Sequence, residues 1–72
     1  MVDSKSDETT TGTVEEVLPN SLFRVRIASE ELLLAYLAGK MKLHRIRVLV
    51  GDQVEMVTDP YGGRARIVRR LT

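Results

Sequence analysis

The sequence contains no cysteine and no tryptophan, and its 72 residues include one phenylalanine, two tyrosines and one histidine. The absence of cysteine excludes disulfide bonds and thiolate metal sites. Because His44 stands alone, we expect no metal site and no Ser–His–acid catalytic triad. No apolar run approaches the ~18 residues that a membrane-spanning helix requires. A small domain without disulfides is typical of the cytoplasm, and we expect no membrane association.

The acidic and glycine residues also lack the spacing that catalysis requires. Glu15–Glu16 and Glu30–Glu31 are adjacent pairs, and neighbouring residues in a strand point to opposite faces, so neither pair forms an acid–base dyad by itself. Gly62–Gly63 lacks the length and the Lys-Ser/Thr of a phosphate-binding loop. We therefore expect no enzyme activity and no cofactor.

Charge is distributed unevenly along the chain. Residues 1–16 hold five acidic residues and one lysine, whereas residues 17–72 hold ten arginines and lysines against five acidic residues. A basic body with a net charge of +5 favours a polyanionic partner, although a solvated cationic surface gives the same count. Residues 1–11 are rich in Ser, Thr and Asp, and we expect a disordered tail there, followed by one domain over residues 12–72.

Apolar residues alternate with polar ones through most of this domain, which indicates β-strands. Phe23, Val25 and Ile27 share one face of a strand, and Arg24 and Arg26 share the other. The alternation predicts strands over residues 11–18, 22–27, 32–38, 52–57 and 64–70. A bulge or bend is expected in the first strand, and one or two helical turns between the third and fourth. This order predicts an all-β fold, a small five-stranded Greek-key OB-fold barrel.

Basic residues gather in three stretches of the predicted barrel. Four cations and a histidine lie within Lys40–Arg47, two arginines lie on the second strand, and four lie on or beside the fifth. Since OB barrels bind nucleic acid on the second and third strands and the adjoining loops, RNA binding is the favoured function. Two alternatives remain for each tyrosine: Tyr36 stacks on a base or covers Leu32 and Leu34, and Tyr61 stacks on RNA or locks its own loop.

Several short motifs occur in a specific order. They are Gly12-Thr-Val-Glu-Glu-Val-Leu-Pro-Asn20, Phe23-Arg-Val25, Gly39-Lys-Met41, Ile46-Arg47, Gly51-Asp52 with Val54, Asp59-Pro-Tyr61, and Arg66-Ile-Val68 with Arg70. In this order and spacing the chain resembles bacterial translation initiation factor one from about Gly12 to Arg70.

The resemblance implies a monomeric protein that binds the decoding (A) site of the small ribosomal subunit. The implied partners are the ribosomal RNA of that site, the neighbouring ribosomal protein and the other two initiation factors. The implied action is to block the A site and to favour initiator tRNA in the adjacent site, in the cytoplasm or in a plastid stroma. Carried over by motif, the resemblance implies that the RNA-facing residues are Arg24, Lys40, Met41, Lys42, Arg47, Tyr61 and Arg66. The basic stretches and the outward position of the third-strand tyrosine add Arg26, Tyr36, His44, Arg45, Arg64 and Arg70 to the expected RNA-binding residues.

The chain also departs from the family pattern. Tyr36 stands where a histidine is common, and Arg45 and Arg69 stand where aromatic residues are common. Simple alternation places Arg69 on the inward face of the last strand, unless the strand has already left the barrel at that point.

Two other functions fit the same sequence. The first is a general RNA-binding module or RNA chaperone of cold-shock type, which requires several exposed aromatic residues. The second is a protein-interaction barrel that docks through Leu32, Leu34 and Tyr36. Binding to RNA weakens steeply as salt rises, whereas apolar docking changes little.

Overall fold

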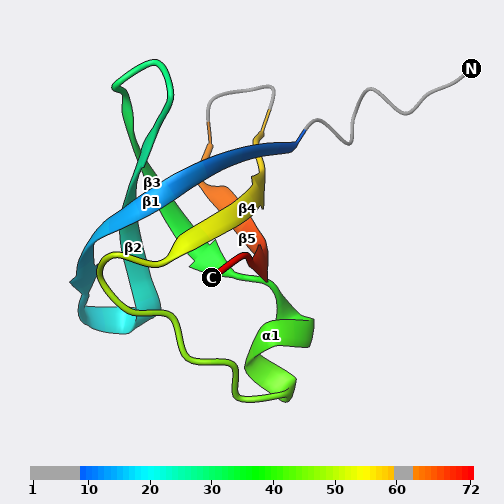
Figure 1. The fold of residues 1–72 in the computed structure, drawn as a ribbon. Coiled ribbons are helices and arrows are strands. Elements are labelled where there is room, and N and C mark those ends of the chain that lie inside the picture. Colours follow the sequence, from blue (N-terminus) through cyan, green and yellow to red (C-terminus); the bar gives the residue numbers. More distant parts are fainter. Residues whose placement is uncertain (1–8, 60–62) are drawn as a thin grey trace, which may run out of the picture.

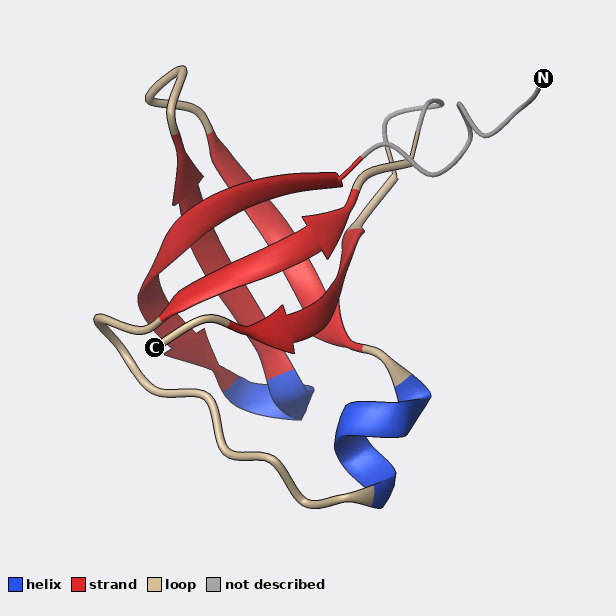
Figure 2. Ribbon diagram, turned by 45° about the vertical axis from the view of Figure 1, so that its right-hand side comes forward, coloured by secondary structure: helices blue, strands red, loops and turns tan. Residues whose placement is uncertain are grey.

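The fold, seen in a computed structural model that describes residues 9–59 and 63–72, is a closed five-stranded barrel (Figure 1). Its spatial order is β1-β2-β3-β5-β4, with β1 closing onto β4. The elements are β1 (Thr9–Leu18), the 3-10 turn η2 (Pro19–Ser21), β2 (Leu22–Ile27), β3 (Leu32–Leu37), α1 (Gly39–Leu43), β4 (Gln53–Val57) and β5 (Ala65–Arg70). The expected five-stranded OB barrel, with its helical turn between the third and fourth strands, is confirmed (Figure 2).

Strand β1 closes the barrel because it pairs with two partners. Residues 9–13 pair with β4, from Thr9 opposite Val57 to Thr13 opposite Gln53, and residues 12–18 pair with β2. A β-bulge at Glu15 interrupts the pairing with β2, as the sequence predicted. The strand begins at Thr9, so the expected tail boundary at residue 11 is corrected because residues 9–11 are hydrogen-bonded to β4. Residues 1–8 lie outside the described part of the chain.

Alternation along the strands fills the barrel with apolar side chains. The buried core consists of Val14, Phe23, Val25, Ala35, Met41, Val48, Val54, Met56, Ala65 and Ile67. No polar or charged side chain is buried among the described residues. Met41 from α1 and Val48 from the α1–β4 loop also belong to this core. The helix α1 lies beyond one end of the barrel (Figure 1).

A second bulge turns the last strand. Ile67 lies opposite Met56, but the next pair is Arg69 opposite Glu55, so Val68 is an extra residue in β5. Arg69 is therefore exposed, and the expected inward parity is corrected. The residue after it, Arg70, lies opposite the buried Val54. The bulge thus places the Arg70 side chain where it reaches the α1–β4 loop.

No helix among the described residues is long and apolar enough to cross a membrane.

Candidate nucleic-acid interface

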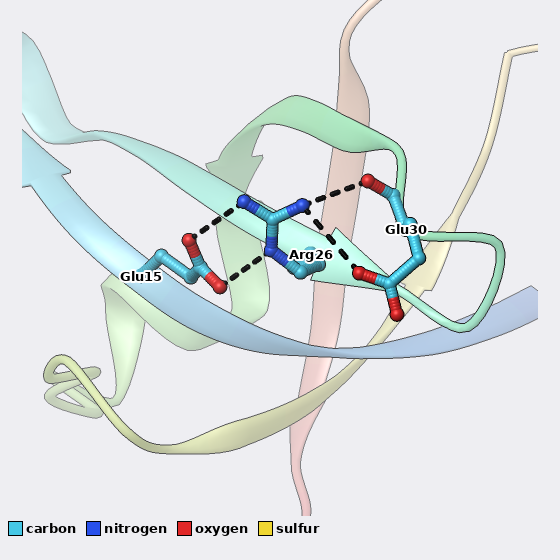
Figure 3. A network of polar contacts seen from close by, with 3 residues as sticks. All are labelled: Glu15, Arg26 and Glu30. Carbon is cyan, nitrogen blue, oxygen red and sulfur yellow. Dashed lines mark hydrogen bonds and ion pairs between the residues drawn. The ribbon is translucent and has the colours of Figure 1, made fainter.

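The arginines of β2 lie on the outer face, as predicted, but they are held by glutamates. Arg26 binds Glu15 through two hydrogen bonds, Nε to Oε2 at 2.6 Å and Nη2 to Oε1 at 3.1 Å (Figure 3). Its Nη1 donates to the carbonyl oxygen of Glu30 at 2.8 Å and lies 3.8 Å from the Glu30 carboxylate. The bulge at Glu15 places one carboxylate beside this guanidinium, and the β2–β3 turn supplies the other.

The contact between Glu15 and Arg26 stabilises the charged form of both groups. The hydrogen bond from Arg26 lowers the pKa of the Glu15 carboxyl group, and its positive charge lowers it further. The same hydrogen bond raises the pKa of Arg26.

Two further arginines form ion pairs across neighbouring strands. Arg24 Nε lies 3.3 Å from Glu16 Oε1, and Arg69 Nε lies 3.1 Å from Glu55 Oε1. Sequence reasoning placed Arg24 among the RNA contacts without identifying Glu16 as its neighbour. The face formed by β1 and β2 thus carries cations whose charge is offset by acidic side chains.

The outer face of β3 and β5 is different, because it combines an aromatic ring with cations. Tyr36 lies opposite Arg66 in the parallel β3–β5 pair, and both line a shallow hollow of about 160 Å³ with Arg64. Val57, Thr58 and Asp59 form the rest of the lining, and sequence reasoning missed them. Within residues 9–59 and 63–72, no ion pair holds Arg64 or Arg66. An exposed ring beside guanidinium groups suits a nucleotide, with a base on the ring and phosphate on the cations.

More cations follow directly after β3, on α1 and the loop that leads to β4. The four cations Lys40, Lys42, Arg45 and Arg47 and the histidine His44 are all exposed, and none forms an ion pair within the described part of the chain. The amide of Ala38, just before α1, donates to the carbonyl oxygen of Ile67 at 2.9 Å, which ties the start of the helix to β5. The chain leaves α1 through Arg45, whose φ of 53° is left-handed. The start of the helix therefore lies beside β5.

Three residues of the expected RNA-binding set need separate comment. Met41 has 1% of its surface exposed, so its side chain packs in the core and offers no surface to RNA. Tyr61 lies outside the described residues. Arg70 donates from Nη1 to the carbonyl oxygen of Arg47 at 2.9 Å and from Nε to that of Thr72 at 3.1 Å.

The structure therefore divides the predicted basic residues into two groups. Tyr36, Arg64 and Arg66 are brought around one hollow, and α1 continues from the same end of β3. Arg24 and Arg26 are instead tied to glutamates on β1 and the β2–β3 turn. In the described residues, no three histidine, aspartate or glutamate side chains gather in a way that suits a metal ion.

Comparison with known sequences identifies one family. The sequence model of the family "Translation initiation factor 1A / IF-1" matches residues 1–72. A curated relative from Rhodospirillum rubrum, "Translation initiation factor IF-1", is 50% identical over 60 residues. That alignment covers 82% of this chain and 63% of the relative, so the chain spans less than two thirds of the relative's length.

Solved structures support the same barrel. The solution structure of the translation initiation factor of this family from the Wolbachia endosymbiont of Brugia malayi is 32% identical, with a TM-score of 0.75, and the match covers 97% of this chain and 86% of that one. YjeQ from Thermotoga maritima is 29% identical with a TM-score of 0.77, over 90% of this chain but 23% of that one. YloQ, a circularly permuted GTPase, is 13% identical with a TM-score of 0.77 over 100% of this chain and 25% of its own, a likeness of fold alone.

Proposed function

Because this chain belongs to the translation initiation factor 1A / IF-1 family, we propose that it is a translation initiation factor that binds the decoding (A) site of the small ribosomal subunit. It contacts ribosomal RNA and the neighbouring ribosomal protein, and it acts as a cytoplasmic monomer together with the other two initiation factors. It works by occupying the site and not by catalysis.

One observation carries this proposal: in the described part of the chain, the basic residues that form ion pairs with glutamates and those that form none lie on different parts of the barrel. The arginines of β2 have glutamate partners, whereas no ion pair within the described residues holds the cations of α1, its following loop and the start of β5. Cations without a protein partner are available to displace counterions from phosphates, which supplies affinity for RNA. The proposed RNA surface consists of Tyr36, Lys40, Lys42, His44, Arg45, Arg47, Arg64 and Arg66, with Arg24 at its margin.

Binding at the A site has two consequences in this proposal. The barrel excludes other ligands from the site because two bodies cannot occupy the same volume. Its binding energy also favours the subunit conformation to which it binds best, and so shifts the population toward that conformation. The proposed result is that initiator tRNA is favoured in the adjacent site until the large subunit joins and the factor leaves.

Chemical footprinting of small ribosomal subunits, with and without the protein, tests the proposal. We expect protection of decoding-site bases by the wild type, and weaker protection by Lys40→Ala and Arg47→Ala at equal concentration. Both variants should keep the wild-type unfolding transition, since both side chains are exposed. Protection elsewhere on the subunit, or none, would remove the decoding-site proposal.

A salt titration separates the two other functions. An RNA contact loses affinity steeply as salt rises, whereas a protein-interaction barrel that docks through Leu32, Leu34 and Tyr36 does not. A cold-shock type chaperone binds unstructured RNA as well as it binds the subunit. Preference for the intact subunit over an unstructured RNA of the same length therefore supports the initiation-factor function.

A further inference from the structure

Arg70 connects two parts of the barrel that are distant in the sequence. Its Nη1 donates to the carbonyl oxygen of Arg47 at 2.9 Å, and its Nε donates to the carbonyl oxygen of Thr72 at 3.1 Å. Arg47 lies in the loop between α1 and β4, within the basic stretch of the proposed RNA surface. The guanidinium group therefore bridges the C-terminal strand and this loop.

The bulge at Val68 makes this bridge possible. Without an extra residue in β5, Arg69 would lie opposite Val54 and Arg70 would lie beyond it. With the bulge, Arg69 pairs with Glu55 on the outer face, and Arg70 lies opposite Val54, whose side chain is in the core. Residues opposite each other in a sheet share a face, so Arg70 extends over the end of the barrel toward the loop.

The loop around Arg47 is anchored on both sides. The amide of Ile46 donates to the carbonyl oxygen of Met41 at 3.0 Å, and the Val48 side chain is buried in the core. The amide of Leu49 donates to Asp52 Oδ2 at 2.9 Å. The bond from Arg70 adds a contact to the peptide group between Arg47 and Val48, and so fixes the backbone from which the Arg47 side chain projects.

We propose that Arg70 is a positioning residue: it holds the Arg47 backbone in place for RNA binding and does not itself bind a phosphate. The inference rests on the proposed function for its consequence in RNA binding. Arginine suits the task because its planar fork directs Nε and Nη1 at two acceptors in fixed directions. Lysine has the same charge but a single terminal ammonium group.

Arg69 provides a matched control, since it has the same side chain, lies next in the sequence and pairs with Glu55 instead of the loop. The test measures affinity for small ribosomal subunits over a range of salt concentrations. The variants are Arg70→Ala, Arg70→Lys, Arg69→Ala, Arg47→Ala and the double variant Arg47→Ala/Arg70→Ala. We expect Arg70→Ala to weaken binding about two- to tenfold, because the Arg47 side chain would then have to be immobilised on binding, and this is the usual cost of ordering one long side chain. The slope of log affinity against log salt should match that of Arg69→Ala.

The double variant gives the second expected result. If Arg70 acts through Arg47, the double variant binds no more weakly than Arg47→Ala alone. Arg70→Lys should bind as weakly as Arg70→Ala, because lysine keeps the positive charge but lacks the planar guanidinium group that donates to two acceptors. A direct phosphate contact by Arg70 gives the opposite pattern. The magnitude of the salt slope of Arg70→Ala would be smaller by about 0.7–0.9 than that of Arg69→Ala. The affinity losses of Arg47→Ala and Arg70→Ala would add in the double variant, and Arg70→Lys would bind more tightly than Arg70→Ala. That pattern would overturn the proposal.

Amide hydrogen exchange of the free protein tests the same bridge without RNA. The amides of Ile46 and Leu49 flank Arg47, and we expect both to exchange faster in Arg70→Ala and Arg70→Lys than in Arg69→Ala. Unchanged exchange at both amides would overturn the proposal. If the wild type shows no salt-dependent binding to the subunit, the proposed function fails, and the exchange rates still decide whether Arg70 fixes the loop.

Discussion

Glu55 of β4 and Arg69 of β5 lie opposite each other on the outside of the barrel, with Nε and Oε1 3.1 Å apart. An ion pair at the surface, here with Arg69 exposed and Glu55 partly covered, contributes little to stability, about 0–1 kcal/mol. The pair is informative because it forms only in the register that the bulge gives to β4 and β5. The pair exists because Val68 bulges out of the ladder, and the same bulge directs Arg70 to the loop after α1.

Tyr36 is expected to be a stacking contact in the proposed complex. Replacement by leucine keeps apolar cover on β3 but removes the aromatic face, so affinity for the small subunit should fall by about 1–3 kcal/mol. Tyr36→Phe should bind like the wild type. The control is Leu32→Ala, on the same outer face but outside the hollow that contains Arg66. Equal losses for Leu32→Ala and Tyr36→Leu would point to an apolar protein contact instead.

The ion pair between Glu15 and Arg26 predicts how stability depends on pH. Arg26 lowers the pKa of Glu15 in the folded protein relative to its ordinary value of 4.5. This contribution is therefore fully present above that ordinary value, and it is lost as the pH falls through the lowered pKa of the folded state.

Urea unfolding of the wild type and Glu15→Gln between pH 7 and pH 3 measures this contribution. The wild type should be more stable at pH 7, and the difference should shrink as the solution is acidified. Glu31→Gln serves as the control, because the Glu31 carboxylate forms no ion pair among the described residues. A difference between wild type and Glu15→Gln that stays constant down to pH 3 would contradict the assignment.

Met41 should behave as a core residue. Met41→Ala removes a side chain that is 1% exposed, and the free energy of unfolding should fall by about 2–5 kcal/mol. Met41→Leu conserves volume and should cost less than about 1.5 kcal/mol. In denaturant unfolding, Leu43→Ala on the same helix is the control, since Leu43 is 76% exposed. A stable Met41→Leu variant that no longer binds the subunit would restore Met41 to the RNA contacts.

Gly12 allows β1 to lie close to β2. A Cβ atom at this position would lie 2.7 Å from the Arg26 carbonyl oxygen and 2.7 Å from Val25 Cγ1. Gly12→Ala should therefore lower the free energy of unfolding by about 1–3 kcal/mol, as overpacking does. At Gly39 no heavy atom lies within 4 Å of the added carbon, so Gly39→Ala should be neutral or stabilising by up to about 1 kcal/mol. Equal thermal midpoints for the two variants would refute the steric explanation.

The sequence predicts most of the fold because the barrel is encoded in local patterns. Phe23 and Val25 alternate with Arg24, and this alternation alone assigns the two faces of β2. The break at Glu15–Glu16 predicts the bend in β1 for the same reason. Each of these features depends on a few consecutive residues, and no knowledge of the partner strand is needed.

The ion pairs and the exact composition of the candidate site could not be predicted in this way. Whether Arg26 meets Glu15 depends on the register between two strands and on the position of a bulge, which are properties of the assembled sheet. Met41 lies on a helix of five residues, which is too short for its periodicity to identify a buried face. Alternation misassigned Arg69 because it assumes an unbroken ladder.

Two core residues hold the basic stretch Lys40–Arg47: Met41 lies within it and Val48 directly follows it. The side chains of these two residues anchor its backbone to the core, and the surface it presents therefore exists before any partner arrives. A preformed cationic surface loses little conformational entropy on association. Encounter with a polyanion then needs no folding step, so the association rate should be set by electrostatic steering and should fall as ionic strength rises.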